Sequence, residues 1–247
     1  MFNMNFKDIN FPKSFSYSNL SENIPFEFFD SVFPVATEVD IILGYFSSNA
    51  IRSLAKSIAL FLYGGGKMRI ITNQFFNEED YDNLFRSLDL DEENKFINLF
   101  DDLENLKNSL SCRDQHFFDC LGYLQREKRL EIIPIKYNSG LAHMKSYIFR
   151  DKEGNTISNS GSINFTYSGI ISNLEKITIY TSWTNKEDAA RVDEDVSIFD
   201  KIYNQKIGGY KRLSHNQLER VIPHLSNNKE LDDLLKDSQE INEKVPQ

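Results

Sequence analysis

Residues 35–74 alternate between strand-like and helix-like patterns, and this alternation constrains the fold more than any other feature of the sequence. The run VATEVDIILGYFS at 35–47 has the apolar character of a buried strand and ends at a Gly and a Ser-Ser-Asn cluster. Residues 50–63 place apolar side chains at helical spacing, and three glycines at 64–66 predict a helix C-cap. A second strand, KMRIITN, follows. Strands that alternate with helices predict a layered α/β fold.

The rest of the chain continues the pattern. Residues 78 to about 130 favour helix, and further strands are predicted at LEIIPIKY, AHMKSYIF, TISNS and EKITIYTSW, with a turn at 152–155. From about residue 211 the sequence is charged and helical, which is more typical of a linker or docking helix than of a core element. We therefore expect one domain over 1–210 and a helical, charged C-terminal tail or linker over 211–247.

The charge of the chain is concentrated in one segment. Between residues 78 and 104 there are 11 Asp and Glu against two basic residues, so this stretch accounts for the whole net charge of −9. We interpret it as a solvated helical surface. The chain has no basic tract that would bind DNA unaided, because counterion release requires several basic side chains on one face. Any affinity for nucleic acid must therefore come largely from elsewhere.

Two further features concern the compartment. The chain has only two cysteines, which argues against a disulfide framework and predicts a reducing cytoplasm. Its start lacks the basic residues and apolar run of a secretory signal, and its longest apolar stretch, IALFLY at 58–63, is far too short to span a bilayer. We expect a cytoplasmic protein that does not engage membranes.

A set of polar residues near the end of the predicted sheet indicates chemistry. His143 and Lys145 are two positions apart on a predicted strand, so they share a face. A small-residue turn, Gly161-Ser162-Ile163-Asn164, follows the next strand, and Glu175 opens the one after. The glycine and serine are expected to let the backbone turn sharply and to present N–H groups to an anion. The four side chains His143, Lys145, Asn164 and Glu175 should meet at one end of the sheet.

This combination suits attack on a phosphodiester. Imidazole is a competent nucleophile near neutral pH, and a carboxylate on its other nitrogen fixes the tautomer. Lysine and asparagine stabilise the charge that builds on the non-bridging oxygens. The sequence places no Asp/Glu cluster of metal-binding type beside them, so the predicted chemistry is metal-free and needs no cofactor.

These residues resemble the phospholipase D superfamily. The matching elements are His143-Met144-Lys145, Gly161-Ser162-Ile163-Asn164 and Asn173-Leu174-Glu175, and the resemblance covers roughly residues 30–185. The family aspartate is expected five residues after the lysine, where this chain has Arg150. Asp151 comes one residue later, which on a strand is the opposite face, so its role is not transferred.

A branch of the superfamily lacks this aspartate: the BfiI-type metal-independent restriction endonucleases and related nuclease domains fused to helicases. The resemblance to it implies a mixed β-sheet flanked by helices on both faces, and a catalytic quartet of His143, Lys145, Asn164 and Glu175 with Ser162 and Asn173 in support. That chemistry needs two histidines, one to attack phosphorus and one to protonate the leaving oxygen. Because this chain carries the motif once, the resemblance implies a homodimer that shares one site. It also implies DNA as substrate, in restriction or anti-phage defence, with a helicase or a DNA-recognition domain or subunit as partner.

Two other functions stay open. One is phosphatidyl transfer or phospholipase activity on lipids, and the other is a catalytically silent dimerisation module of a helicase-containing complex. Each residue also has an ordinary structural interpretation: Ser162 and Asn164 as turn residues, and Glu175 as a surface residue.

Several residues outside the motif were also considered. Cys112, His116 and Cys120 share a helical face, and we favour structural cysteines over a metal site because a fourth ligand is missing. His215 and His224 are predicted at the surface. The side chains of Tyr180, Trp183 and Tyr210 are predicted to serve packing rather than base stacking.

Overall fold

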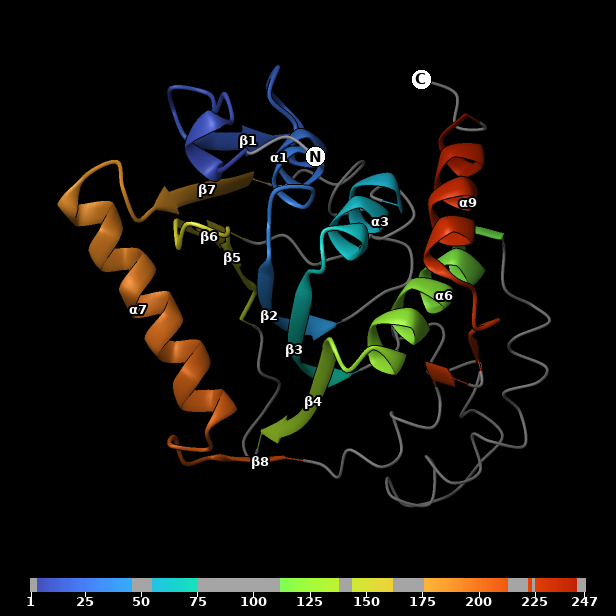
Figure 1. Ribbon diagram of the computed structural model, residues 1–247. Helices are drawn as coiled ribbons and strands as arrows, with labels where there is room; N and C mark the ends of the chain where they lie inside the picture. Colours follow the sequence, from blue (N-terminus) through green and yellow to red (C-terminus); the bar gives the residue numbers. More distant parts are fainter. Residues whose placement is uncertain are drawn as a thin grey trace.

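The computed structural model describes residues 4–45, 55–74, 112–137, 144–161, 176–212, 222–223 and 225–243. Figure 1 shows a β-sheet with helices on both sides. Along the chain the elements are η1 (Phe6–Asp8), β1 (Ser16–Ser18), α1 (Pro25–Val32), β2 (Glu38–Tyr45), α3 (Ala55–Tyr63), β3 (Lys67–Gln74), α6 (Cys112–Arg126), β4 (Leu130–Tyr137), β5 (Ser146–Arg150), β6 (Thr156–Gly161), β7 (Lys176–Thr181), α7 (Lys186–Tyr203), β8 (Tyr210–Arg212) and α9 (Leu231–Glu243).

The sheet is mixed. Within the described residues its eight strands follow the order β1-β7-β6-β5-β2-β3-β4-β8. The central strands β2, β3 and β4 run parallel to one another, whereas every other neighbouring pair is antiparallel. The predicted α/β class, a mixed sheet flanked by helices on both faces, is confirmed.

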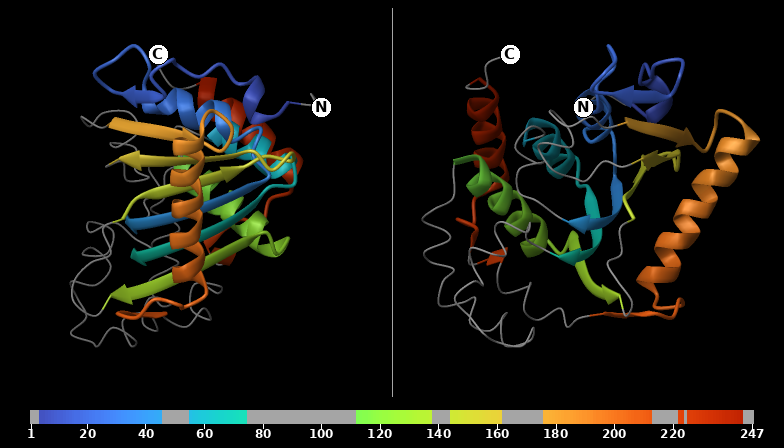
Figure 2. Two further views of the ribbon diagram at one scale, coloured as in Figure 1. Left: turned by 90° about the vertical axis from the view of Figure 1, so that its left-hand side faces the viewer. Right: turned by 180° about the vertical axis from the view of Figure 1, so that it is seen from behind.

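The two faces of the sheet are covered unequally. Among the described elements, helices α1, α3, α6 and α9 cover one face and enclose the main core, whereas α7 crosses the other face (Figures 1 and 2). On the main-core face, Tyr147 and Phe149 of β5 are fully buried, with Phe149 edge-on against Phe33 at 5.3 Å between ring centroids. Under α7 a smaller cluster gathers around Phe199.

The predicted β2–α3–β3 unit and its glycine cap are confirmed for the described residues. Gly65 takes a φ of +83°, and the N–H groups of Gly65 and Gly66 donate to the carbonyls of Leu62 and Phe61. This is the Schellman arrangement that ends many helices. Glycine is also required at position 66, because a Cβ there would lie 2.1 Å from the Phe61 ring.

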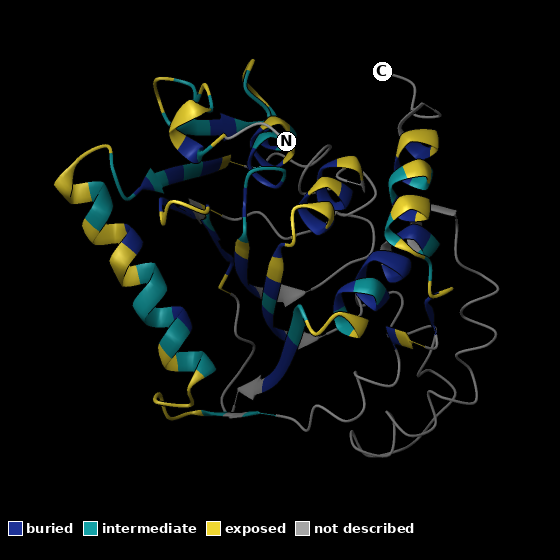
Figure 3. Ribbon diagram, viewed as in Figure 1, coloured by how far each residue is buried: buried dark blue, intermediate teal, exposed yellow. Residues whose placement is uncertain are grey.

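The described residues of the C-terminal part contact the rest of the chain. Strand β8 pairs with β4, and α9 packs on α3 and α6, where the side chain of Leu234 is fully buried in the main core. Figure 3 shows that α9 turns buried positions inward and exposed positions outward. The described residues beyond 210 thus pack against the folded unit. Helix α9 is amphipathic and buries its apolar side against α3 and α6, which themselves cover the sheet.

Candidate active site

One edge of the sheet gathers the ends of strands that carry the predicted motif. The left panel of Figure 2 shows the arrowheads of β2, β3 and β4 on the same side. Because β5 is antiparallel to β2 and pairs Ser146 with Ile42, its beginning lies at this edge too. The end of β6 and the beginning of β7 join it, since Gly161 pairs with Ile177. We call this the motif edge.

Lys145 is the predicted quartet residue that the structure describes. It directly precedes β5, which begins at Ser146, three residues later than a strand that included both His143 and Lys145 would begin. Its side chain is only 8% exposed, whereas the neighbouring Met144 is 42% exposed. A lysine is seldom buried to this extent unless its side chain is paired, and Lys145 does have an interaction partner in the structure.

The other predicted site residues lie outside the described residues: His143, Ser162, Asn164, Asn173 and Glu175. Their placement relative to Lys145 therefore stays a prediction. The same holds for the acidic segment 78–104, for His215 and His224, and for the side chain of Cys112.

The glycine of the motif has a different structural role from the one expected. Gly161 is the last residue of β6 rather than part of a turn. A Cβ at this position would lie 2.5 Å from the main-chain oxygen of Lys176 and 3.1 Å from Cα of Ile177. Close approach of β6 to β7 therefore requires glycine here.

Asp151 lies at the far end of β5 from Lys145. Its buried carboxylate accepts hydrogen bonds from the main-chain N–H groups of Phe6, Glu153 and Asn155 at 2.8–2.9 Å, and from the Asn155 side chain at 2.8 Å. Arg150, at the position of the family aspartate, binds the buried Asp40 at 2.5 Å. Both residues serve the fold at the edge opposite the motif edge.

A row of alternating charges crosses the sheet under α7, and sequence reasoning missed it. Arg150, Asp40, Arg69, Glu131 and Arg212 come from β5, β2, β3, β4 and β8 in spatial order. Arg69 donates two hydrogen bonds of 2.6 Å to Asp40, and Arg212 pairs with Glu131 at 3.1 Å. Asp40 and Arg69 are direct partners in the sheet register, as are Arg69 and Glu131. Opposite charges side by side on adjacent strands stabilise their pairing.

The aromatic side chains of α7 close over this row. The Arg69 guanidinium lies 4.8 Å from the Phe199 ring centroid and 4.7 Å from that of Tyr203. Burial opposes the charge of Arg69, but its hydrogen bond and attraction to Asp40 outweigh burial and raise the pKa of the guanidinium. The signal in the sequence was a charged residue at matching positions of three predicted strands.

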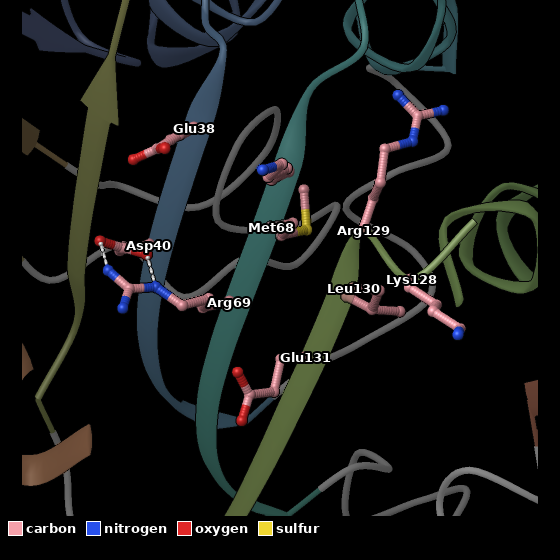
Figure 4. Close-up of a pocket in the computed structure, with 9 residues that line it drawn as sticks. Glu38, Asp40, Met68, Arg69, Lys128, Arg129, Leu130 and Glu131 are labelled. Carbon is pink, nitrogen blue, oxygen red and sulfur yellow. Dashed lines mark hydrogen bonds and ion pairs between the residues drawn. The ribbon is translucent and has the colours of Figure 1, made fainter. Parts of the chain in front are cut away.

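A pocket of about 330 Å³ adjoins this row at the first residues of β2, β3 and β4 (Figure 4). Its lining mixes both signs of charge, because it includes the acidic Glu38, Asp40 and Glu131 and the basic Lys67, Arg69, Lys128 and Arg129. Since these strands begin at the edge opposite the motif edge, the pocket is separate from the candidate active site.

His116 and Cys120, both on α6, contact each other near α9, where His116 approaches Asp237. The Cys120 sulfur lies 3.5 Å from His116 Nε2, both side chains are buried, and burial raises the pKa of the Cys120 thiol far above its ordinary value. Such a thiol is unreactive, in keeping with the structural role favoured from the sequence. The described part of the chain holds no group of three His, Cys, Asp or Glu side chains that could bind a metal ion. Nor does it contain a helix long and apolar enough to cross a membrane.

Comparison with protein-family models and with curated proteins finds no match. Among solved structures, the chain is similar to NucT from Helicobacter pylori, with 17% identity, a TM-score of 0.43, and coverage of 73% of this chain and 87% of that one. It is also similar to phosphatidylserine synthase from Haemophilus influenzae Rd KW20, with 14% identity, a TM-score of 0.45 and coverage of 93% of this chain. It spans only 44% of the length of that synthase. Similarity of this degree carries no argument about the chemistry of this chain.

Proposed function

We propose that this protein is a metal-independent phosphodiesterase of the phospholipase D type that cleaves DNA, as a restriction or anti-phage endonuclease of the cytoplasm. The observation that supports this most is the convergence at the motif edge. Lys145, Gly161 and Lys176 lie at this edge, and in the sequence they are two residues after His143, directly before Ser162 and directly after Glu175. The three parts of the motif, 32 residues apart from first to last, are thus attached at neighbouring points.

The charge at this edge suits a phosphate. Lys145 is buried there and Lys176 is exposed there, so two lysines lie at this edge. A buried ammonium acts on a phosphate oxygen more strongly than one in bulk water, since the low dielectric weakens screening. Lys145 and Asn164 would hold the non-bridging oxygens, Glu175 would orient His143, and Ser162 and Asn173 would support the loop.

The reaction would proceed through a covalent phosphohistidine. A nitrogen of His143 attacks phosphorus, the bond from phosphorus to the leaving oxygen breaks, and a second histidine gives that oxygen its proton. Water then attacks the phosphohistidine and gives a proton to the second histidine, the phosphorus–nitrogen bond breaks, and both histidines return to their starting states. Because the chain carries one motif, the second histidine would be the partner's His143 in a homodimer. A helicase or a DNA-recognition domain or subunit would supply target affinity that the chain itself lacks.

The test is cleavage of supercoiled plasmid DNA in the presence of EDTA. We expect the wild type to cleave and His143→Ala to lose activity by about 10³-fold or more, since a nucleophile acts as a unit with its partners. Met144→Ala is the matched control, because it alters the exposed residue between His143 and Lys145 and should cleave normally. Sedimentation analysis of the wild type should show a dimer.

Two results would contradict the proposal. Complete dependence of cleavage on added magnesium would exclude the histidine mechanism, and equal cleavage by His143→Ala would exclude this site. Release of headgroup from phosphatidylcholine vesicles without DNA cleavage would instead favour a lipid substrate. Absence of any cleavage, with the helicase partner present, would favour a silent dimerisation module.

A further inference from the structure

Strands β5 and β6 cease to pair before they reach the motif edge. Their antiparallel ladder runs from Arg150 and Thr156 to Ile148 and Ser158 and stops there. On the outer sides, β5 stays paired with β2 as far as Ser146, and β6 stays paired with β7 as far as Gly161. The sheet is therefore interrupted between its two motif-bearing strands, at the end where Lys145 lies.

The side chain of Asn159 bridges this interruption. The main-chain N–H of Tyr147 donates to Asn159 Oδ1 at 2.7 Å, so a side-chain amide replaces the main-chain acceptor that a continued ladder would supply. The donor identifies the atom that faces it as the carbonyl oxygen of the amide. Because an unsatisfied buried N–H is destabilising, this bond holds β5 in place next to Lys145.

The other end of the same amide is a hydrogen-bond donor that is not satisfied within the described residues. Asn159 is 3% exposed, and its Nδ2 atom is buried without a hydrogen-bond partner there. Native proteins seldom leave such a group unpaired, and where they do the group calls for a ligand or a functional explanation.

Lys145 shows what kind of ligand this would be. Lys145 directly precedes β5 and comes two residues before Tyr147, whose side chain lies in the main core. Asn159 follows Ile157 on β6 by two residues, and Ile157 lies in the same core. The unsatisfied donor on β6 and the buried Lys145 before β5 thus lie on neighbouring segments near the motif edge. An ammonium and an amide N–H together select an oxyanion.

We propose that Asn159 is a further phosphate-binding residue of the candidate active site, in addition to the motif residues. Its Oδ1 anchors β5 through Tyr147, and its Nδ2 donates to a non-bridging oxygen of the substrate phosphate. This inference rests on the proposed phosphodiesterase function for its substrate, but its ligand, a phosphate group, can be tested without DNA.

The experiment compares two substitutions at Asn159 in the full chain. Asn159→Asp keeps an acceptor for Tyr147 but replaces the donor by a charged oxygen, whereas Asn159→Leu removes both functions. Affinity for inorganic phosphate is measured by calorimetry, and protection of the Tyr147 amide is measured by hydrogen exchange. We expect both variants to weaken phosphate binding about tenfold or more, since a hydrogen bond to a charged group is lost. Only Asn159→Leu should lose protection at Tyr147.

The matched control is Asn155→Asp at the other end of the hairpin. Asn155 is also buried and its side chain donates to Asp151, so the same substitution there should lower stability while leaving phosphate affinity of the folded protein unchanged. DNA cleavage in EDTA is measured in parallel, and the turnover rate of Asn159→Asp should fall with its phosphate affinity.

The outcomes separate this inference from the proposed function. If the wild type cleaves DNA and Asn159→Asp binds phosphate and cleaves normally, the role of Asn159 is overturned. It is also overturned if the wild type binds no phosphate at millimolar concentration. If the wild type binds phosphate through Asn159 but cleaves no DNA, the site stands and the nuclease function fails.

Discussion

At the scale of single residues, two buried carboxylates, Asp151 beside the motif and Asp40 on β2, serve the fold. Asp151 organises the β5–β6 turn and ties η1 to it through the main-chain N–H of Phe6. Asp40 is only 2% exposed and is neutralised by Arg69 and Arg150 together. A buried carboxylate can therefore serve the architecture alone, even beside a motif. Its hydrogen-bond partners show whether its role is structural or catalytic.

We predict that Asp151→Ala destabilises the protein by about 3 kcal/mol or more, because several buried N–H groups lose their acceptor at once. Urea denaturation measures the loss. Below the unfolding transition, activity in EDTA per folded molecule should equal that of the wild type. Asp193→Ala, on the exposed side of α7, is the control and should change stability little. Loss of activity in a folded Asp151→Ala protein would show that this carboxylate belongs to the site after all.

At the scale of elements, three helices end in the same way. After α3, α6 and α7, the residue in the left-handed region is Gly65, Lys128 and Gln205, respectively, with φ between 54° and 83°. In each case the next residue donates its N–H back to the helix five residues earlier. The glycine cap was readable from the sequence, but the other two were not, since lysine and glutamine carry no signal for this conformation.

Lys128→Gly should therefore raise the free energy of unfolding by about 0.5–1 kcal/mol, since glycine adopts this conformation without strain. Urea denaturation at neutral pH gives the change. Lys201→Gly, inside α7, introduces the same residue in a right-handed helical position and should lower stability by up to about 1 kcal/mol. If both substitutions lowered the free energy of unfolding by the same amount, the role assigned to Lys128 would be contradicted.

At the scale of the whole molecule, the C-terminal segment completes the main core. The buried carboxylate of Asp119 on α6 accepts a hydrogen bond of 2.5 Å from the N–H of Asn227 and pairs with Lys229 at 3.8 Å. Lys229 in turn binds Asp237 of α9. These contacts, with Leu234 against α3 and α6, attach α9 to the layer that covers the sheet.

We expect Leu234→Ala to destabilise the protein by about 2–5 kcal/mol through loss of buried contacts and the cavity left behind. The unfolding transition should remain single, because α9 belongs to the same cooperative unit. Leu20→Ala is the control, because Leu20 is 77% exposed, and its midpoint should stay within error of the wild type. An unchanged midpoint for Leu234→Ala would mean that residues 231–243 behave as an independent tail.

The sequence by itself determined the features that depend on neighbours along the chain: the alternation of strands and helix over 35–74, the glycine cap, and a motif whose order indicates phosphodiester chemistry. Tertiary structure decided the rest: the close approach that requires Gly161, the charge row through Arg69, the Asn159–Tyr147 bridge and the docking of α9. The physical reason is the range of the contacts. Periodicity and capping act over a few residues, whereas these four features join residues from 12 to more than 100 positions apart.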